Sequence, residues 1–270
     1  MNIMNTNTYK TIQELLIKLE QQLTVGLETA PKGNLRISKC RTAIQYYHCH
    51  ENCKSQNGTY IKKKERALAQ ALAQRDYEQE LLSTAKHAFR QLQQNPLYFK
   101  SVYKELGSVY ETQNELRKSL IVPVILPNDS YIENWMNATY QTKPFADFTN
   151  EIYTQRGERV RSKSEKIIAD AMNQAGVPYR YEKPLLVGSM LVHPDFTILD
   201  TDTRTEFYWE HLGMMDSPDY LKNALHKIQQ YEKAGIFQGE RMIYTFESTQ
   251  TPLDTRLVER MISHYFLNAD

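Results

Sequence analysis

Two apolar segments in the second half of the chain each carry one acidic residue, and they constrain the fold more than any other feature. They are His193–Leu199 (HPDFTIL) and Glu206–Gly213 (EFYWEHLG). Their aliphatic and aromatic residues predict buried strands, in which a carboxylate is rarely tolerated without a partner. Asp195 and Glu210 are therefore candidate ligands of a hard divalent cation, which prefers oxygen donors and commonly acts on phosphate.

The segments around these two strands alternate between helical and extended patterns. Helices are predicted over residues 162–175, 217–234 and 253–266, and strands over residues 179–186, 193–199, 206–213 and 241–246. Ser162 and Glu165 have the spacing of a capping box, which marks the start of the first helix. This order predicts an α/β (α+β) domain, with a mixed central sheet flanked by helices.

The first half of the chain is mainly helical. Apolar periodicity predicts helices over residues 8–28, 64–94 and 97–120, and residues 35–63 predict an inserted β-hairpin with an Asn57-Gly58 turn. Pro123 and Pro127 lack the amide donor that a helix needs, so a linker is expected there. The predicted organisation is a helical region over residues 1–122, a linker with a short helix over residues 123–157, and the α/β domain over residues 158–270.

The C-terminal half resembles the PD-(D/E)XK nuclease superfamily, whose members share a restriction-endonuclease-like core. The resemblance covers residues 158–268 and rests on Glu165, Pro194-Asp195 and Glu210. It implies that Asp195 and Glu210 hold Mg²⁺ or Mn²⁺ and that Glu165 supports the metal at the edge of the site. The implied function is metal-dependent hydrolysis of phosphodiester bonds in nucleic acid, with DNA expected rather than RNA.

One position departs from the pattern of that superfamily. The family's lysine follows the second acid by two residues, and this chain has Leu212 there. The resemblance then implies a catalytic lysine from another element, and Lys227 in the following helix is the first candidate. Lys222 and Lys183 are the second and third candidates.

Two other functions are open at this stage. Because Leu212 stands where a lysine is expected, the chain could be a nuclease-like scaffold that binds nucleic acid without cleaving it. It could also be a helical interaction or assembly protein whose carboxylates are structural.

Charge is divided unevenly along the chain. Residues 1–128 contain 18 Lys and Arg against 11 Asp and Glu, whereas residues 129–270 contain 15 against 21. A basic front half is typical of an arm that contacts nucleic acid, and equally of charges scattered over solvated helix faces. Lys62, Lys63, Lys64 and Arg66, close to several tyrosines, are the candidate phosphate contacts, with a solvated start of a helix as the alternative.

The three cysteines, Cys40, Cys49 and Cys53, are too few for a disulfide framework. Together with His48 and His50 they suggest a zinc site, but a hairpin with buried cysteines explains the same residues. The sequence shows neither a signal peptide nor a long apolar run, so a cytoplasmic protein without a membrane span is expected. The N-terminal region would bind the nucleic acid or form a homodimer.

Overall fold

The computed structural model describes residues 3–41, 43–50, 58–145 and 151–267. The chain divides into two compact units: residues 5–131 form one, and residues 132–270 together with residues 1–4 form the other. Each unit has its own hydrophobic core. Among the described residues, no helix combines the length and the apolar character needed to cross a membrane.

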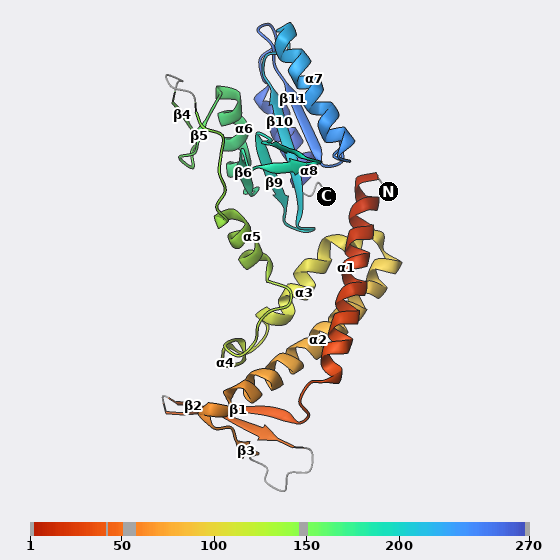
Figure 1. Cartoon of the computed structure of the whole chain (residues 1–270), viewed down its shortest axis with the longest axis vertical. Helices are drawn as coiled ribbons and strands as arrows, with labels where there is room; N and C mark the ends of the chain where they lie inside the picture. Colours follow the sequence, from red (N-terminus) through yellow and green to blue (C-terminus); the bar gives the residue numbers. More distant parts are fainter. Residues whose placement is uncertain (1–2, 42, 51–57, 146–150, 268–270) are drawn as a thin grey trace. The chain divides into compact units, whose positions relative to one another are not determined.

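The N-terminal unit is a set of helices with a small sheet (Figure 1). Its elements are α1 (Ile3–Glu28), β1 (Asn34–Cys40), β2 (Ala43–Cys49), β3 (Thr59–Tyr60), η1 (Lys63–Glu65), α2 (Arg66–Gln94), η2 (Pro96–Ser101), α3 (Val102–Glu111) and α4 (Glu115–Lys118). Apolar residues that recur every three or four positions place α1, α2 and α3 around one core. α5 (Asn128–Asn137) follows and contains the boundary between the two units.

The single helix predicted over residues 97–120 is wrong, because this segment forms η2, α3 and α4. Asn114 explains the break between α3 and α4, and Asn95 caps the start of η2. The side chain of Asn95 accepts a hydrogen bond from the amide of Leu97 at 3.1 Å, and that of Asn114 accepts one from the amide of Leu116 at 2.9 Å. Asparagine at such positions satisfies free amides and starts a new helix, so it interrupts the helical pattern.

The predicted hairpin is part of a three-stranded antiparallel sheet with the order β1-β2-β3. Leu35, Ile37 and Tyr46 lie on one face of this sheet and pack against the helical core. Because successive residues of a strand point to opposite faces, the other face of the sheet points away from the helices.

The C-terminal unit is a mixed α/β structure, as the sequence predicts. Its elements are β4 (Ile152–Tyr153), β5 (Arg159–Val160), α6 (Lys163–Gln174), β6 (Tyr179–Tyr181), β7 (Leu185–Val187), β8 (Met190–Val192), β9 (Phe196–Asp200), β10 (Thr205–Leu212), α7 (Pro218–Lys233), β11 (Met242–Phe246) and α8 (Thr255–Phe266). The central sheet has the order β11-β10-β9-β6. β10 and β11 are parallel, whereas β9 is antiparallel to both of its neighbours, so the sheet is mixed.

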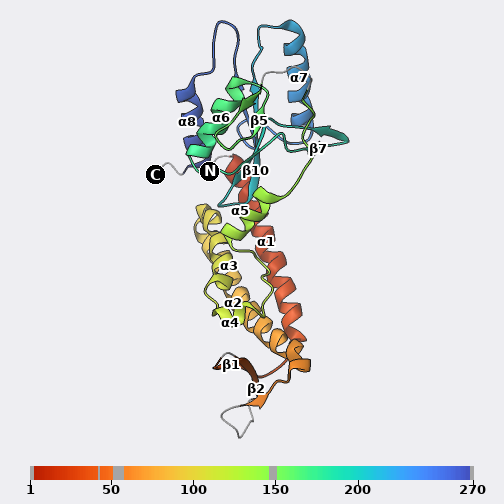
Figure 2. The same cartoon turned by 90° about the vertical axis from the view of Figure 1, so that its left-hand side faces the viewer.

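Helices cover both faces of the central sheet. In Figure 2, α6 and α8 lie on one side of β10 and α7 lies on the other. Phe196, Phe207 and Trp209 point into the core beneath α6 and α8. Tyr208 and Tyr244 point into the core beneath α7. The alternation of residues along β10 therefore decides which helix each side chain meets.

Two predicted strands are shorter than expected. The strand predicted over residues 179–186 ends at Tyr181, because Glu182 has a φ of 46°, which breaks an extended strand. β7 and β8 then form a separate hairpin around Gly188, whose φ of 61° suits glycine. The strand predicted from His193 begins at Phe196, so Asp195 lies directly before β9.

Part of the segment predicted as a linker contacts the C-terminal unit. The indole Nε1 of Trp135 donates to a carboxylate oxygen of Glu206 at 2.7 Å, and the hydroxyl of Tyr140 donates to the carbonyl of Tyr181 at 2.7 Å. The guanidinium of Arg180 lies 4.3 Å from the centre of the Tyr140 ring. These contacts hold residues 132–140 on the strands of the unit.

Because side chains of the central sheet are buried, truncating one of them should lower the free energy of unfolding substantially. Ile198 of β9 is fully buried, so Ile198→Ala should lower the free energy of unfolding by about 2–5 kcal/mol. The chain has two tryptophans, Trp135 and Trp209, so tryptophan fluorescence during urea unfolding reports on the C-terminal unit. Leu186→Ala is the control, because Leu186 is 69% exposed and its loss should change the free energy by less than about 0.5 kcal/mol.

Candidate functional site

Asp195 and Glu210 lie close together in the C-terminal unit. The register of β9 and β10 pairs Phe196 with Trp209, so its continuation places Asp195 opposite Glu210. Since Trp209 faces α6 and α8, Glu210 faces α7, and the charges of Glu210 and Lys227 also act on Asp195. The amide of His211 on β10 donates to Asp195 Oδ2 at 2.6 Å, and this contact fixes the carboxylate against the neighbouring strand.

α7 places a lysine and a tyrosine on Glu210. Lys227 Nζ lies 2.6 Å from both carboxylate oxygens of Glu210, and the Tyr231 hydroxyl donates to Oε1 at 2.6 Å. Lys227 and Tyr231 are four residues apart, which puts them on one side of the helix. Glu210 is 2% exposed, so these two groups compensate for the water that its carboxylate loses on folding.

The charges of this cluster act on one another. Burial raises the pKa of Asp195 well above its usual range, and the nearby charge of Glu210 raises it further, whereas Lys227 lowers it. Burial opposes the charged form of Lys227, but Glu210 and Asp195 together raise the pKa of its ammonium. Burial and the Glu210 carboxylate also raise the pKa of Tyr231. Two acids thus share one ammonium in a site poor in water.

Glu165 has a separate set of partners. Its amide donates to the hydroxyl of Ser162 at 3.0 Å, as the predicted cap requires. Its carboxylate accepts from the amide of Arg161 at 2.9 Å and from the hydroxyl of Tyr181 at 2.7 Å. Glu165 is close enough to raise the pKa of Asp195. Within the described ranges, however, no three His, Cys, Asp or Glu side chains form a group able to hold a metal. The structure therefore brings together Asp195, Glu210 and Lys227, and leaves Glu165 outside a common ligand group.

The two other candidate lysines lie away from Glu210. Lys222 is exposed on α7. Lys183 pairs with Glu206, and its ammonium lies 5.8 Å from the centre of the Trp135 indole. Of the three lysines considered from the sequence, Lys227 is the one beside the acids.

Neighbouring polar residues belong to other networks. His211 points to the opposite face from Glu210, where its Nδ1 lies 3.0 Å from Thr245 Oγ1 and its Nε2 lies 3.6 Å from Glu247. Glu182 forms a two-pronged pair with Arg161, at 2.7 and 3.0 Å. Sequence reasoning missed Tyr231, although its position one turn after Lys227 is a signal that could have indicated it.

The other predicted residues lie in the N-terminal unit. Lys62, Lys63, Lys64 and Arg66 are exposed in and beside η1. Cys40 and Cys49 are free thiols at opposite ends of the β1–β2 ladder, and Cys53 lies outside the described residues. The structure therefore does not bring Cys40 and Cys49 together as a pair of zinc ligands.

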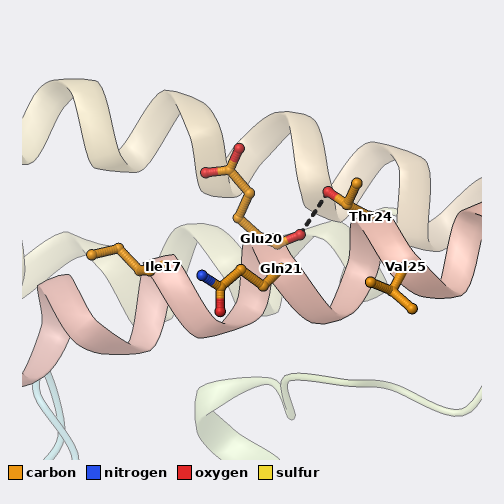
Figure 3. Close-up of a pocket in the computed structure, with 5 residues that line it drawn as sticks. All are labelled: Ile17, Glu20, Gln21, Thr24 and Val25. Atoms are coloured by element: carbon orange, nitrogen blue, oxygen red, sulfur yellow. Dashed lines mark hydrogen bonds between the residues drawn. The ribbon is translucent and has the colours of Figure 1, made fainter.

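A shallow pocket lies on the surface of α1 (Figure 3). Ile17, Glu20, Gln21, Thr24 and Val25 line it, and the hydroxyl of Thr24 donates to the backbone carbonyl of Glu20 at 2.7 Å. Its one ionisable side chain lacks the second acid or base that a catalytic site of this kind would need. We therefore do not consider it a candidate for chemistry.

Comparison with known proteins gives little further guidance. No model of a known protein family matches the chain, and no solved structure matches it significantly. An uncharacterized protein of Methanocaldococcus jannaschii is 35% identical over 100 residues. That match covers 37% of this chain and 8% of the archaeal protein, so the chain spans a small part of its relative. The match alone assigns no activity.

Because Lys227 pairs with the buried Glu210, the stability of the C-terminal unit should depend on Lys227. Lys227→Met would leave a buried carboxylate without a cation and should lower the free energy of unfolding by about 3 kcal/mol, at the lower end for buried pairs because 31% of the lysine side chain is exposed. Urea unfolding followed by tryptophan fluorescence measures this change. Lys222→Met, on the same helix but exposed, should cost less than about 0.5 kcal/mol. Equal costs for the two variants would mean that the Lys227–Glu210 pair contributes nothing to stability.

Proposed function

We propose that this protein is a metal-dependent nuclease that hydrolyses phosphodiester bonds in nucleic acid, DNA rather than RNA. The observation that carries the proposal is that Asp195, directly before β9, lies close enough to Glu210 of β10 for their charges to interact, with Lys227 2.6 Å from Glu210. Paired acids with an adjacent ammonium are suited to activating water against a phosphate.

The architecture of the C-terminal unit supports the same proposal. A helix, three strands of one sheet, a second helix, a parallel fourth strand and a third helix follow one another as α6, β6, β9, β10, α7, β11 and α8. This arrangement is compatible with a restriction-endonuclease-like core. The resemblance assigns one acid to the second strand and one to the third, and here Asp195 lies directly before β9 and Glu210 lies in β10.

The donor set fits Mg²⁺ or Mn²⁺. Mg²⁺ is commonly held by one or two carboxylates and retains several waters, so Asp195 and Glu210 would suffice as protein ligands. Burial raises the pKa of Asp195 and the nearby charge of Glu210 raises it further, so a divalent cation between the two acids would stabilise their charged forms. When bound, the ion would lower the pKa of a bound water and neutralise phosphate oxygens.

The remaining residues would hold the reacting groups in place. The Lys227 ammonium would orient the attacking water and stabilise the charge that develops on the phosphate oxygens. Tyr231 would hold the Glu210 carboxylate, and the amide of His211 would hold that of Asp195. Glu165 would contribute charge at the edge of the site.

One observation favours the inactive scaffold as a second candidate. Lys227 lies equally close to both oxygens of Glu210, so an ion pair satisfies this acid without any metal. In an active enzyme the ammonium would have to share Glu210 with the metal. A protein that uses the pair only for stability would bind nucleic acid without cleaving it.

Cleavage assays on labelled single-stranded, duplex and branched DNA and on RNA, with Mg²⁺ or Mn²⁺, test the proposal. Asp195→Asn, Glu210→Gln and Lys227→Met should each reduce the cleavage rate at least about 100-fold, because each removes charge stabilisation in the transition state. Glu232→Gln, an exposed acid on α7, is the control and should leave the rate unchanged. Full activity in Asp195→Asn would rule out the assigned site. DNA binding without any nicking in Mn²⁺ would favour the inactive scaffold.

Metal binding also predicts a change in stability that does not depend on cleavage. A ligand at 100 times its Kd stabilises the folded state by about 2.7 kcal/mol. Mn²⁺ should therefore raise the Tm of the wild-type protein, followed by tryptophan fluorescence, and should not raise that of Asp195→Asn. If both proteins respond alike, Asp195 is not a ligand.

A further inference from the structure

We propose that the open face of the β1-β2-β3 sheet binds single-stranded nucleic acid, with bases stacked on tyrosines and phosphates held by unpaired cations. This second site goes beyond the proposed cleavage and involves neither Asp195 nor Glu210. It lies within the N-terminal unit and can be tested without a metal.

A row of three side chains crosses this face. The strand registers pair Arg36 with Tyr47 and Tyr47 with Tyr60. The guanidinium of Arg36 lies 4.4 Å from the centre of the Tyr47 ring, and the two tyrosine rings lie edge to face with centres 5.7 Å apart. Tyr60 is 50% exposed, so its ring surface is available to a ligand.

The row lies on the face that the protein core does not use. Leu35, Ile37 and Tyr46 alternate with these residues and pack against the helices. Arg36, Tyr47 and Tyr60 consequently point away from the helices of their unit. A tyrosine at this position gains little from the core, so packing alone does not explain an aromatic pair here.

The positive charge of the first half of the chain is concentrated around this sheet. Residues 31–66 contain nine Lys and Arg against two Asp and Glu. The rest of residues 1–128 contains nine of each kind. The surplus of seven charges is therefore confined to the sheet and its flanks, and is not scattered over the helices.

The side chains of the cations around this sheet have no carboxylate partners among the described residues. Across the parts of the chain that the structure describes, no carboxylate pairs with any of seven cations on or beside the sheet: Arg36, Lys39, Arg41, Lys62, Lys63, Lys64 and Arg66. On the helices some cations do have such partners, since Arg75 and Arg117 both pair with Asp76 and Lys86 pairs with Glu20. Charges without partners can neutralise phosphates without first breaking an ion pair.

The tyrosines favour single strands over duplexes. Aromatic side chains stack on the faces of unpaired bases, which a duplex keeps covered by its own stacking. In a single strand, phosphates and unpaired bases alternate, so cations without partners can contact the phosphates while exposed rings stack on the bases. Such a surface selects for strandedness and not for sequence.

Fluorescence anisotropy with the full-length protein tests the stacking, in EDTA so that no cleavage occurs. A labelled twenty-nucleotide oligothymidylate should bind more tightly than a duplex of the same length. Tyr60→Ala should weaken oligothymidylate binding about tenfold, and Tyr60→Phe should restore it, because stacking needs only the ring. Tyr153→Ala, at an exposed tyrosine of β4 with 48% exposure, is the control and should bind as the wild type does.

The dependence of binding on salt tests the charges. The triple variant Lys62→Gln, Lys63→Gln, Lys64→Gln should reduce the slope of log K against log salt by about 2, since each phosphate contact on a single strand contributes about 0.7. The control changes three exposed helix lysines, Lys10→Gln, Lys18→Gln and Lys104→Gln, and should leave the slope unchanged.

Three results would overturn the proposal. They are no binding of oligothymidylate by the wild type, equal slopes for the two triple variants, and wild-type affinity in Tyr60→Ala. Because the assay contains no divalent metal, these results are independent of whether Asp195 and Glu210 catalyse cleavage.

Discussion

The contact between Lys227 and Glu210 is the interaction on which the C-terminal unit most depends. Glu210 lies in β10, beside a core that is mainly apolar, and its carboxylate is almost fully removed from water. Such a charge is costly unless a cation and hydrogen-bond donors surround it. Lys227 and Tyr231 provide both, and Asp195 beside them adds a second acid that the single ammonium does not fully offset.

The topology of the sheet makes this contact available. β10 and β11 are parallel, so the chain must cross over one face of the sheet between them, and α7 is that crossover. β9 and β10 are antiparallel neighbours, which places Asp195 beside the end of β10. Lys227 thus reaches Glu210 from α7, the element that follows β10 in the chain. If the proposed nuclease activity is correct, the fold supports the chemistry through α7 and not through β10.

Several features could be predicted because they depend on neighbours in sequence. The Ser162–Glu165 cap, the period of α1 and the apolar strands around Asp195 and Glu210 are local patterns, and the structure has a helix or strand at each. Predictions of where a helix or strand ends were less successful, because a single residue can end it. Asn114 divided an expected helix because its side chain competes for a backbone amide. The φ of Glu182 ended β6 early, and no pattern of apolar residues indicates such a turn.

The sequence by itself determined that one acid would lie within an apolar strand and another at the start of the neighbouring one, that helices would flank them, and that the basic surplus belongs to the first half of the chain. These properties follow from residue type and spacing alone. Only the tertiary structure decided that Lys227, and not Lys222 or Lys183, meets Glu210, that Glu165 has other partners, and that Arg36, Tyr47 and Tyr60 form one row. The reason is that each of these contacts joins residues from different elements, and their distances depend on sheet register and helix packing.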